Sequence, residues 1–270
     1  MSEIAYDDLL ACAVEAAQAA GNYARDQKHR VDDVKVSFEH DIKLALDFEC
    51  QQKAREVLLS AFPGHTVLGE EDPEIVDTDE MPEHQWVVDP IDGTVNFSHG
   101  MPFWCCSIAV RKKGETVAGA VYGPDVNELY TATVDRKSTC NGEPISVSET
   151  QTLDKAMIMT GVDQFVDPSL PPFAIFKSFA SNAQKVRVMG SAALDICRVA
   201  NGAADGYFEA GIYLWDVAAA QLIVEQAGGK AEILYDMPPP YRICFAASNG
   251  RIHDQLTSLV DISSLQEWKG

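Results

Sequence analysis

The sequence predicts a mixed α/β fold whose sheets include antiparallel strands. Amphipathic helical patterns alternate along the 270 residues with short apolar or β-branched runs. Three consecutive runs, at 105–110, 117–122 and 129–134, are separated by the turn-forming stretches R-K-K-G-E and G-P-D-V-N. This spacing is typical of an antiparallel meander, which argues against an all-parallel sheet.

Helices and strands alternate before this meander. A stripe of Leu, Ala, Cys and Val at helical spacing predicts a helix at 6–25, and a second stripe predicts another at 41–62. The expected strands are an edge strand at 34–38, a strand at 66–69 and a buried strand at 86–88, which Pro90 ends because it has no N–H to donate.

The second half of the chain continues the alternation. The expected strands lie at 155–161, 186–189, 205–209 and 243–247. The expected helices lie at 173–181, from the end of the 186–189 strand to near 201, at 215–226, where two glycines close the helix, and at the C-terminus. A turn at 141–143 and a Pro-rich loop at 167–172 are also expected. Exposed N–H groups where the helix after 189 begins would suit an anion or a hydroxyl. The organisation predicted is one domain, 1–270, with two lobes at about 1–150 and 151–270.

Composition and charge limit the function classes. A hydrophobic content of 46% and a charged content of 23% are ordinary for a globular protein, and the N-terminus shows neither a leader pattern nor an apolar span, so we expect a cytoplasmic protein. Seven scattered cysteines without C-x-x-C spacing indicate reduced core residues. A formal net charge of −20 makes nucleic acid and anionic membranes unsuitable partners, although it equally fits a solubility trait.

Acidic side chains gather where two predicted strands end. Asp89 and Asp92 follow the buried strand, and Glu70 and Glu71 follow the strand before it. Two like charges about 4 Å apart repel by roughly 4 kcal/mol at an effective dielectric of 20, so such a cluster takes up protons or holds cations. Hard oxygen ligands favour Mg²⁺.

The residues after Asp92 add groups that suit a phosphate. Gly93 lets the backbone approach a ligand, and Thr94 supplies a hydroxyl. A simple capped turn is the plain alternative for this acidic stretch, as an ordinary helix cap is for Asp216. A phosphatase with the D-x-D-G-T nucleophile motif does not fit, because Pro90 occupies the position two before Asp92.

Three motifs together resemble the inositol monophosphatase family. They are G-E-E at 69–71, D-P-I-D-G-T-V-N-F at 89–97 and W-D-V-A-A-A-Q-L-I-V-E-Q-A-G-G at 215–229. The resemblance implies the five-layer αβαβα sandwich shared by inositol monophosphatases and fructose-1,6-bisphosphatases. It also implies a homodimer and inhibition by lithium.

The resemblance also implies roles for individual residues. The first Mg²⁺ would be held by Glu70, Asp89 and the Ile91 carbonyl, the second by Asp89, Asp92 and Asp216, and a third, weaker ion would lie near Glu70. The catalytic residues would be Glu70, Thr94 and Asp47, with the threonine hydroxyl, bonded to Asp47, orienting or deprotonating the attacking water. The substrate-binding residues would be Asp92, Gly93, Thr94, Ala192, Glu209 and Asp216, although Glu209 also reads as a solvated loop acid.

The D-I-K-L-A-L-D stretch at 41–47 resembles the family's D-x-V-T-x-x-D, with Lys43 and Leu44 in place of the usual Val-Thr pair. Gly100 stands where many relatives carry a basic residue. The activity implied is Mg²⁺-dependent hydrolysis of inositol monophosphates, small-molecule phosphate esters, to inositol and phosphate. The alternatives are the same chemistry on fructose 1,6-bisphosphate, NADP, histidinol phosphate or 3′-phosphoadenosine 5′-phosphate, or a catalytically silent, metal-binding interaction protein.

Overall fold

The computed structural model describes residues 4–30, 34–37, 42–72, 81–162 and 170–267. In these ranges the strands form a seven-stranded sheet, a five-stranded sheet and a small pair of β1 (Val34–Ser37) with β2 (Ile42–Leu44). The seven-stranded sheet runs, in spatial order, β3 (Thr66–Gly69), β4 (His84–Asp92), β5 (Cys105–Lys112), β6 (Glu115–Gly123), β7 (Glu128–Thr133), β8 (Arg136–Cys140) and β9 (Glu143–Pro144). The five-stranded sheet runs β11 (Lys185–Arg187), β10 (Met157–Thr160), β12 (Gly206–Tyr213), β14 (Arg242–Ser248) and β13 (Lys230–Met237).

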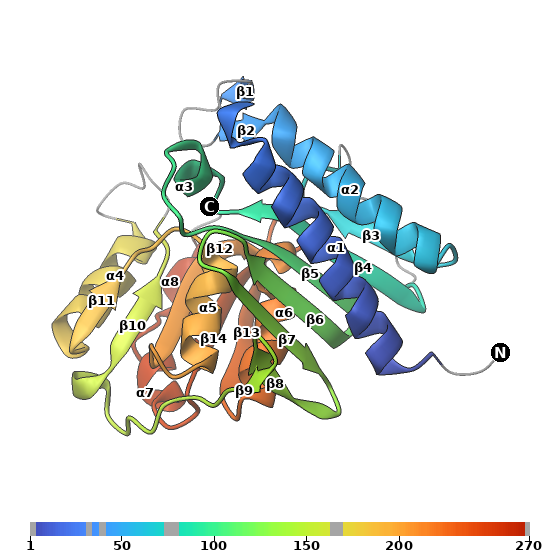
Figure 1. The fold of residues 1–270 in the computed structure, drawn as a ribbon. Helices are drawn as coiled ribbons and strands as arrows, with labels where there is room; N and C mark the ends of the chain where they lie inside the picture. Colours follow the sequence, from blue (N-terminus) through green and yellow to red (C-terminus); the bar gives the residue numbers. More distant parts are fainter. Residues whose placement is uncertain (1–3, 31–33, 38–41, 73–80, 163–169, 268–270) are drawn as a thin grey trace.

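Helices cover both sheets and fill the space between them, which gives the predicted αβαβα layers (Figure 1). Helices α1 (Tyr6–Asp26) and α2 (Ala45–Ala61) lie side by side on the outer face of the seven-stranded sheet. Helices α5 (Ala192–Ala200) and α6 (Leu214–Gln226) pack between the two sheets, and the outer face of the five-stranded sheet is covered by α4 (Pro171–Asn182), α7 (His253–Thr257) and α8 (Ile262–Glu267).

The alternation of side chains along β5 explains why this sheet has helices on both faces. Cys106, Ile108 and Val110 pack with α1 and α2, whereas Cys105 and Ala109 pack toward α5 and α6. Successive side chains of a strand point to opposite faces, so a nearly continuous apolar run buries both. None of the described helices is both long and apolar enough to cross a bilayer.

The prediction that Pro90 ends the central strand is wrong. β4 continues to Asp92, and its pairing with β5 shifts between Asp89, opposite Ser107, and Asp92, opposite Cys105. Three steps along β4 therefore face two along β5, which defines a β-bulge, a position where proline is tolerated. Because the bulge adds one residue, Asp89 and Asp92 point to the same face of the sheet instead of opposite faces.

Other elements also differ from the prediction, for example β12, which continues to Tyr213 and not only to 209. The second helix begins at Ala45 rather than near 41, because 42–44 form β2 (Ile42–Leu44), which pairs with β1 (Val34–Ser37); Asp41 itself lies outside the described residues. The strand predicted from 155 begins at Met157, after the 3₁₀ turn η2 (Leu153–Lys155). The predicted terminal helix is two short helices, α7 and α8.

Strand β8 and the edge strand β13 were not predicted from the sequence. β8 reads R-K-S-T-C and is polar, whereas β13 reads K-A-E-I-L-Y-D-M and combines the exposed Lys230 and Glu232 with a short apolar run at 233–235. β8 therefore offered no apolar run, and in β13 a bulge between Ile233 and Tyr235 breaks the alternation of apolar and polar residues that predicts a strand.

Candidate active site

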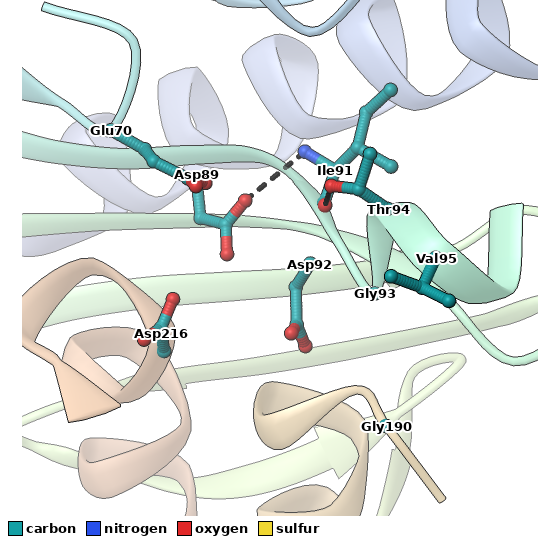
Figure 2. A pocket seen from close by; sticks show the side chains of 9 residues that line it. All are labelled: Glu70, Asp89, Ile91, Asp92, Gly93, Thr94, Val95, Gly190 and Asp216. Atoms are coloured by element: carbon teal, nitrogen blue, oxygen red, sulfur yellow. Dashed lines mark hydrogen bonds between the residues drawn. The ribbon is translucent and has the colours of Figure 1, made fainter. Parts of the chain in front are cut away.

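A cavity of about 220 Å³ opens where the ends of β3 and β4 meet the N-terminal ends of α5 and α6 (Figure 2). Its walls combine four carboxylates with backbone at a tight turn. The lining residues are Glu70, Asp89, Ile91, Asp92, Gly93, Thr94, Val95, Gly190 and Asp216. Segments more than 140 residues apart in sequence thus meet at one small polar space.

Asp89 lies on the part of β4 just before the bulge. Its Oδ1 accepts the Ile91 N–H at 3.1 Å, and the residue is 1% exposed. Burial raises the pKa of Asp89 well above its usual value, and the negative charges of Glu70, Asp92 and Asp216 raise it further. Figure 2 shows Glu70, from the turn after β3, pointing toward it. A cation bound among these groups would stabilise the charged form of Asp89 against both its burial and the repulsion from the neighbouring carboxylates.

Asp92 connects the end of β4 with the start of α5. Its Oδ2 accepts the Ser191 hydroxyl at 2.6 Å and the Ala193 N–H at 2.8 Å, and its Oδ1 accepts the Ala192 N–H at 3.0 Å. The Cys105 thiol donates to Oδ2 at 3.4 Å. Burial raises the pKa of Asp92, and these hydrogen bonds partly oppose that rise. The helix N–H groups predicted to be exposed are therefore taken by a carboxylate of the protein itself.

Asp216 belongs to a capping box at the start of α6. Its Oδ2 accepts the Tyr213 N–H at 2.8 Å, so Asp216 takes part in capping the helix, but from the third helical position, since the N-cap residue itself is Tyr213. The side chain also lines the cavity. Burial raises the pKa of Asp216 well above its usual value, and the negative charges of Glu70 and Asp92 raise it further. One carboxylate can thus cap the helix and still present an oxygen to the cavity.

Gly93 and Thr94 form the turn that follows β4. Gly93 has φ +92°, and a Cβ there would lie 2.9 Å from the Gly190 carbonyl oxygen, so only glycine fits without displacement. The Thr94 hydroxyl is 3.0 Å from the Ile91 carbonyl oxygen and 3.4 Å from Asp47 Oδ1. Asp47, buried in the first turn of α2, is therefore a second acceptor within reach of the hydroxyl, although it does not line the cavity.

Two predicted substrate residues lie outside the cavity lining. The Ala192 N–H is bonded to Asp92, and Glu209 on β12 accepts the Tyr207 hydroxyl. The Glu209 carboxylate also lies beside Gly161, where a Cβ would come within 2.1 Å of it, and the residue is partly buried on a strand instead of being a loop acid. Val95, Gly190, Ser191 and Cys105 were not predicted as site residues, although the helix start that follows Gly190 was expected to expose N–H groups; their side-chain contacts depend on the tertiary fold.

The donor chemistry of the cavity fits a hard divalent cation. Across the described part of the chain, no three His, Cys, Asp or Glu side chains are grouped closely enough to hold one ion in their present orientations. One reason is the orientation of Asp92, because both its carboxylate oxygens accept hydrogen bonds from the start of α5. The cavity nevertheless offers four carboxylates and no nitrogen or sulfur side chain, which is the donor set that Mg²⁺ prefers.

A chain of Ser248, His253 and Glu232 elsewhere contains the residue types of a catalytic triad, but with the two ring nitrogens of the histidine exchanged. Ser248 Oγ lies 2.9 Å from His253 Nδ1, and His253 Nε2 lies 3.2 Å from Glu232 Oε2. The serine is 0% exposed and its hydroxyl oxygen accepts the Gly250 N–H, so no substrate can reach it. This arrangement is structural and not a nucleophile site.

Comparison with known proteins decides the family. The model of the inositol monophosphatase family matches residues 5–262. The chain belongs to this family.

Similar proteins carry two kinds of name. The Nus factor SuhB of Pasteurella multocida is 38% identical over 225 residues, which cover 82% of this chain and 83% of that protein. The inositol-1-monophosphatase of Synechocystis is 35% identical over 236 residues, which cover 84% of this chain and 79% of that protein. The family thus includes relatives named for a phosphatase activity and others named as Nus factors.

Solved structures share the fold. The inositol monophosphatase from Anabaena superposes with a TM-score of 0.80 at 33% identity, covering 97% of this chain and 99% of that chain. The suppressor protein SuhB from Bartonella henselae gives a TM-score of 0.84 at 30% identity, covering 94% and 98%. The layered α/β architecture predicted from the sequence is therefore that of the inositol monophosphatases.

Proposed function

We propose that this chain is a Mg²⁺-dependent phosphomonoesterase that hydrolyses inositol monophosphates. The observation that carries the proposal is the convergence of Glu70, Asp89, Asp92 and Asp216 on one cavity beside the Gly93–Thr94 turn. Four carboxylates sharing so small a space favour the binding of divalent cations, and cations there would give a protein of net charge −20 a local attraction for a phosphate.

The proposed ligands follow the arrangement of the cavity. Glu70, Asp89 and the Ile91 carbonyl would hold one Mg²⁺, and Asp89, Asp92 and Asp216 a second, with a third, weaker ion near Glu70. Bound in this way, the metal would neutralise phosphate charge, lower the pKa of a water and stabilise the leaving alkoxide. Because Asp92 now accepts four donors, its side chain must exchange some of these bonds when it acts as a ligand.

Thr94 and Asp47 would handle the proton of the attacking water. The threonine hydroxyl can accept a hydrogen bond from that water while its own proton is directed at Asp47, 3.4 Å away. The Gly93 and Thr94 N–H groups would donate to phosphate oxygens. Asp92, Asp216, Glu209 and the backbone of Ala192 would contact substrate hydroxyls. The reaction is an in-line displacement by water, in which positioning and charge stabilisation supply the rate.

Inositol monophosphates are favoured by the names of the Synechocystis and Anabaena relatives. The competing substrates are fructose 1,6-bisphosphate, NADP, histidinol phosphate and 3′-phosphoadenosine 5′-phosphate. A second candidate is a catalytically silent, metal-binding interaction protein, which the name Nus factor of several relatives favours. The presence of Glu70, Thr94 and Asp47 argues for turnover.

The test is phosphate release from a panel of these esters, with and without Mg²⁺, for the wild type and for Asp92→Asn. We expect inositol monophosphates to have the highest kcat/KM, and turnover to require both the metal and Asp92. If another ester has a higher kcat/KM, the proposed metal site stands and the proposed substrate is wrong. Absence of turnover on every ester, with Mg²⁺ binding seen by calorimetry, would establish the interaction protein instead.

Three further proposals rest on the family. We expect Li⁺ to inhibit, because it can occupy a Mg²⁺ position, and full activity at saturating Li⁺ would exclude this. We expect a homodimer in solution, which light scattering would contradict by finding only a 29.5 kDa monomer. We expect a cytoplasmic protein, which cell fractionation tests.

A further inference from the structure

The turn that carries Glu70 is held from both sides by side-chain hydrogen bonds. The Glu71 N–H donates to Gln51 Oε1 at 2.9 Å, and the Gly69 N–H donates to Asp72 Oδ2 at 2.9 Å. Glu70 itself donates its N–H to the Val88 carbonyl at 3.1 Å. Three successive amides of this turn are therefore fixed, two of them by side chains that the proposed chemistry does not use.

The two anchoring side chains are also bonded to each other. Gln51 Nε2 donates to Asp72 Oδ1 at 2.9 Å, and Arg55 Nη2 donates to the same oxygen at 2.6 Å. The pattern of donors and acceptors is complete: the glutamine oxygen accepts from the turn, its nitrogen donates to the aspartate, and the other aspartate oxygen accepts from the turn. Changing the amide to an acid, or the acid to an amide, breaks this pattern.

Close packing makes the anchor specific. Gln51 is 0% exposed, and a Cβ on Gly69 would lie 2.2 Å from its Oε1 and 2.3 Å from its Cδ. The φ of Gly69 is not in the left-handed region, so its glycine serves the space that Gln51 occupies and not the backbone conformation. The first residue of the G-E-E motif is thus small because of a residue on α2.

Helix α2 brings the anchor close to the proposed proton acceptor. Gln51 follows Asp47 by four residues, and residues at this spacing lie on the same face of a helix. One face of α2 therefore contacts Thr94 through Asp47 and the Glu70 turn through Gln51. A shift of α2 would therefore move Asp47 and Gln51 together, and with them the contacts to Thr94 and to the Glu70 turn.

We propose that Gln51 and Asp72 are positioning residues that fix the backbone on both sides of Glu70 and so set the affinity of the site for divalent metal. This inference rests on the proposed metal-dependent function, and it adds residues outside the cavity. Residues that orient metal ligands typically change metal affinity by 10–100-fold when they are replaced.

A swap of the amide and the acid tests this directly. In Gln51→Glu, a carboxylate oxygen faces the Asp72 carboxylate and the donor is lost. In Asp72→Asn, the new NH₂ faces a donor in either orientation, Gly69 N–H or Gln51 NH₂. In the double variant both turn amides again donate to side-chain oxygens, and only the bond between positions 51 and 72 is reversed, because the amide introduced at position 72 donates to the carboxylate introduced at position 51. Arg55 lies one turn further along α2 and can still reach that carboxylate.

We expect each single variant to raise the Mg²⁺ concentration for half-maximal binding about tenfold, measured by calorimetry, and the double variant to return within about threefold of the wild type. Gln221→Glu is the matched control, since Gln221 also donates to a carboxylate, Glu225, but on the exposed face of α6. It should leave Mg²⁺ binding unchanged. Thermal melts check that all variants fold.

A second measurement needs neither metal nor substrate. In the metal-free protein, hydrogen exchange at the Gly69 and Glu71 amides should become about tenfold faster in each single variant and recover in the double. A double variant at least as impaired as the singles, or singles indistinguishable from wild type, overturns the proposal. Wild type that binds no Mg²⁺ overturns it as well, whereas wild type that binds Mg²⁺ without turnover refutes only the proposed enzymatic function.

Discussion

Replacing Gly93 with alanine tests how closely the β4 turn approaches the segment before α5. Gly93 has φ +92°, and an added Cβ would lie 2.9 Å from the Gly190 carbonyl oxygen and 3.2 Å from the Phe103 carbonyl oxygen and Ser191 Cβ. All three neighbours are backbone or the first atom of a side chain, so none can rotate away. The substitution must displace the chain.

The expected cost has two parts that a control can separate. A left-handed alanine costs about 1–2 kcal/mol, offset by about 0.4–1 kcal/mol from the lower entropy of the unfolded chain. Forced contacts in a packed region add about 1–3 kcal/mol. Gly142 has φ +82° and nothing within 4 Å of its Cβ position, so Gly142→Ala carries the first part alone. We therefore expect Gly93→Ala to lose about 2–4 kcal/mol and Gly142→Ala about 0.5–1 kcal/mol.

Denaturant unfolding of both variants measures the difference, and for a chain of this size the larger loss corresponds to roughly 5–10 °C in Tm. Phosphate release should fall more than about tenfold in Gly93→Ala and stay near wild type in Gly142→Ala, because Ser191 and the amides after it hold Asp92. Equal losses of stability in the two variants would show that the close approach at Gly190 does not exist.

Three further predictions concern the cavity and the fold. Thr94→Val should lower kcat by about 10²–10³-fold while Thr94→Ser retains most activity, because only the hydroxyl reaches Asp47; a loss below about tenfold in the valine variant would exclude the proton-transfer role. In the metal-free protein, the raised pKa of Asp216 means that the folded state keeps a proton that the unfolded chain releases above about pH 4, so stability should fall as pH rises from there toward the folded pKa. Asp216→Asn, which can keep the bond from Tyr213, should flatten this slope in pH-dependent denaturation, and unchanged slopes would contradict the assigned cause. Chemical unfolding should be one transition by fluorescence and circular dichroism, because one apolar core contains residues of both large sheets, and separate transitions would divide the chain into two domains.

Local pattern was enough to predict most elements of the fold. The helix at 6–25 and the strand at 66–69 were predicted nearly to their ends, since a periodic apolar stripe or a short β-branched run reflects burial that each element needs by itself. The edge strand β13 was missed because a bulge between Ile233 and Tyr235 interrupts the alternation of its apolar and polar residues. The carboxylates at the ends of β3 and β4 were found because adjacent strands end at the same edge of the sheet.

Contacts between distant segments could not be predicted in this way. Asp92 and Ser191 are 99 residues apart, and nothing in either stretch specifies the hydroxyl that one donates to the other. The bulge at Pro90 was misread for the opposite reason. Proline does interrupt a ladder, but an antiparallel partner can absorb one extra residue, and sequence alone does not show whether the strand stops or bulges.

The bulge explains how one strand end can supply two acidic groups to a single cavity. In a regular strand without a bulge, side chains three positions apart point to opposite faces, and Asp92 would point toward α1 and α2 when Asp89 points toward α6. Ile91 takes that other face instead and packs in the outer core. Deleting one residue between Asp89 and Asp92 would keep both acids on the same face but straighten the strand and carry the Gly93 turn away from Gly190. The proline that was predicted to end the strand is thus part of the backbone irregularity that lets β4 serve a core on one face and a carboxylate cavity on the other.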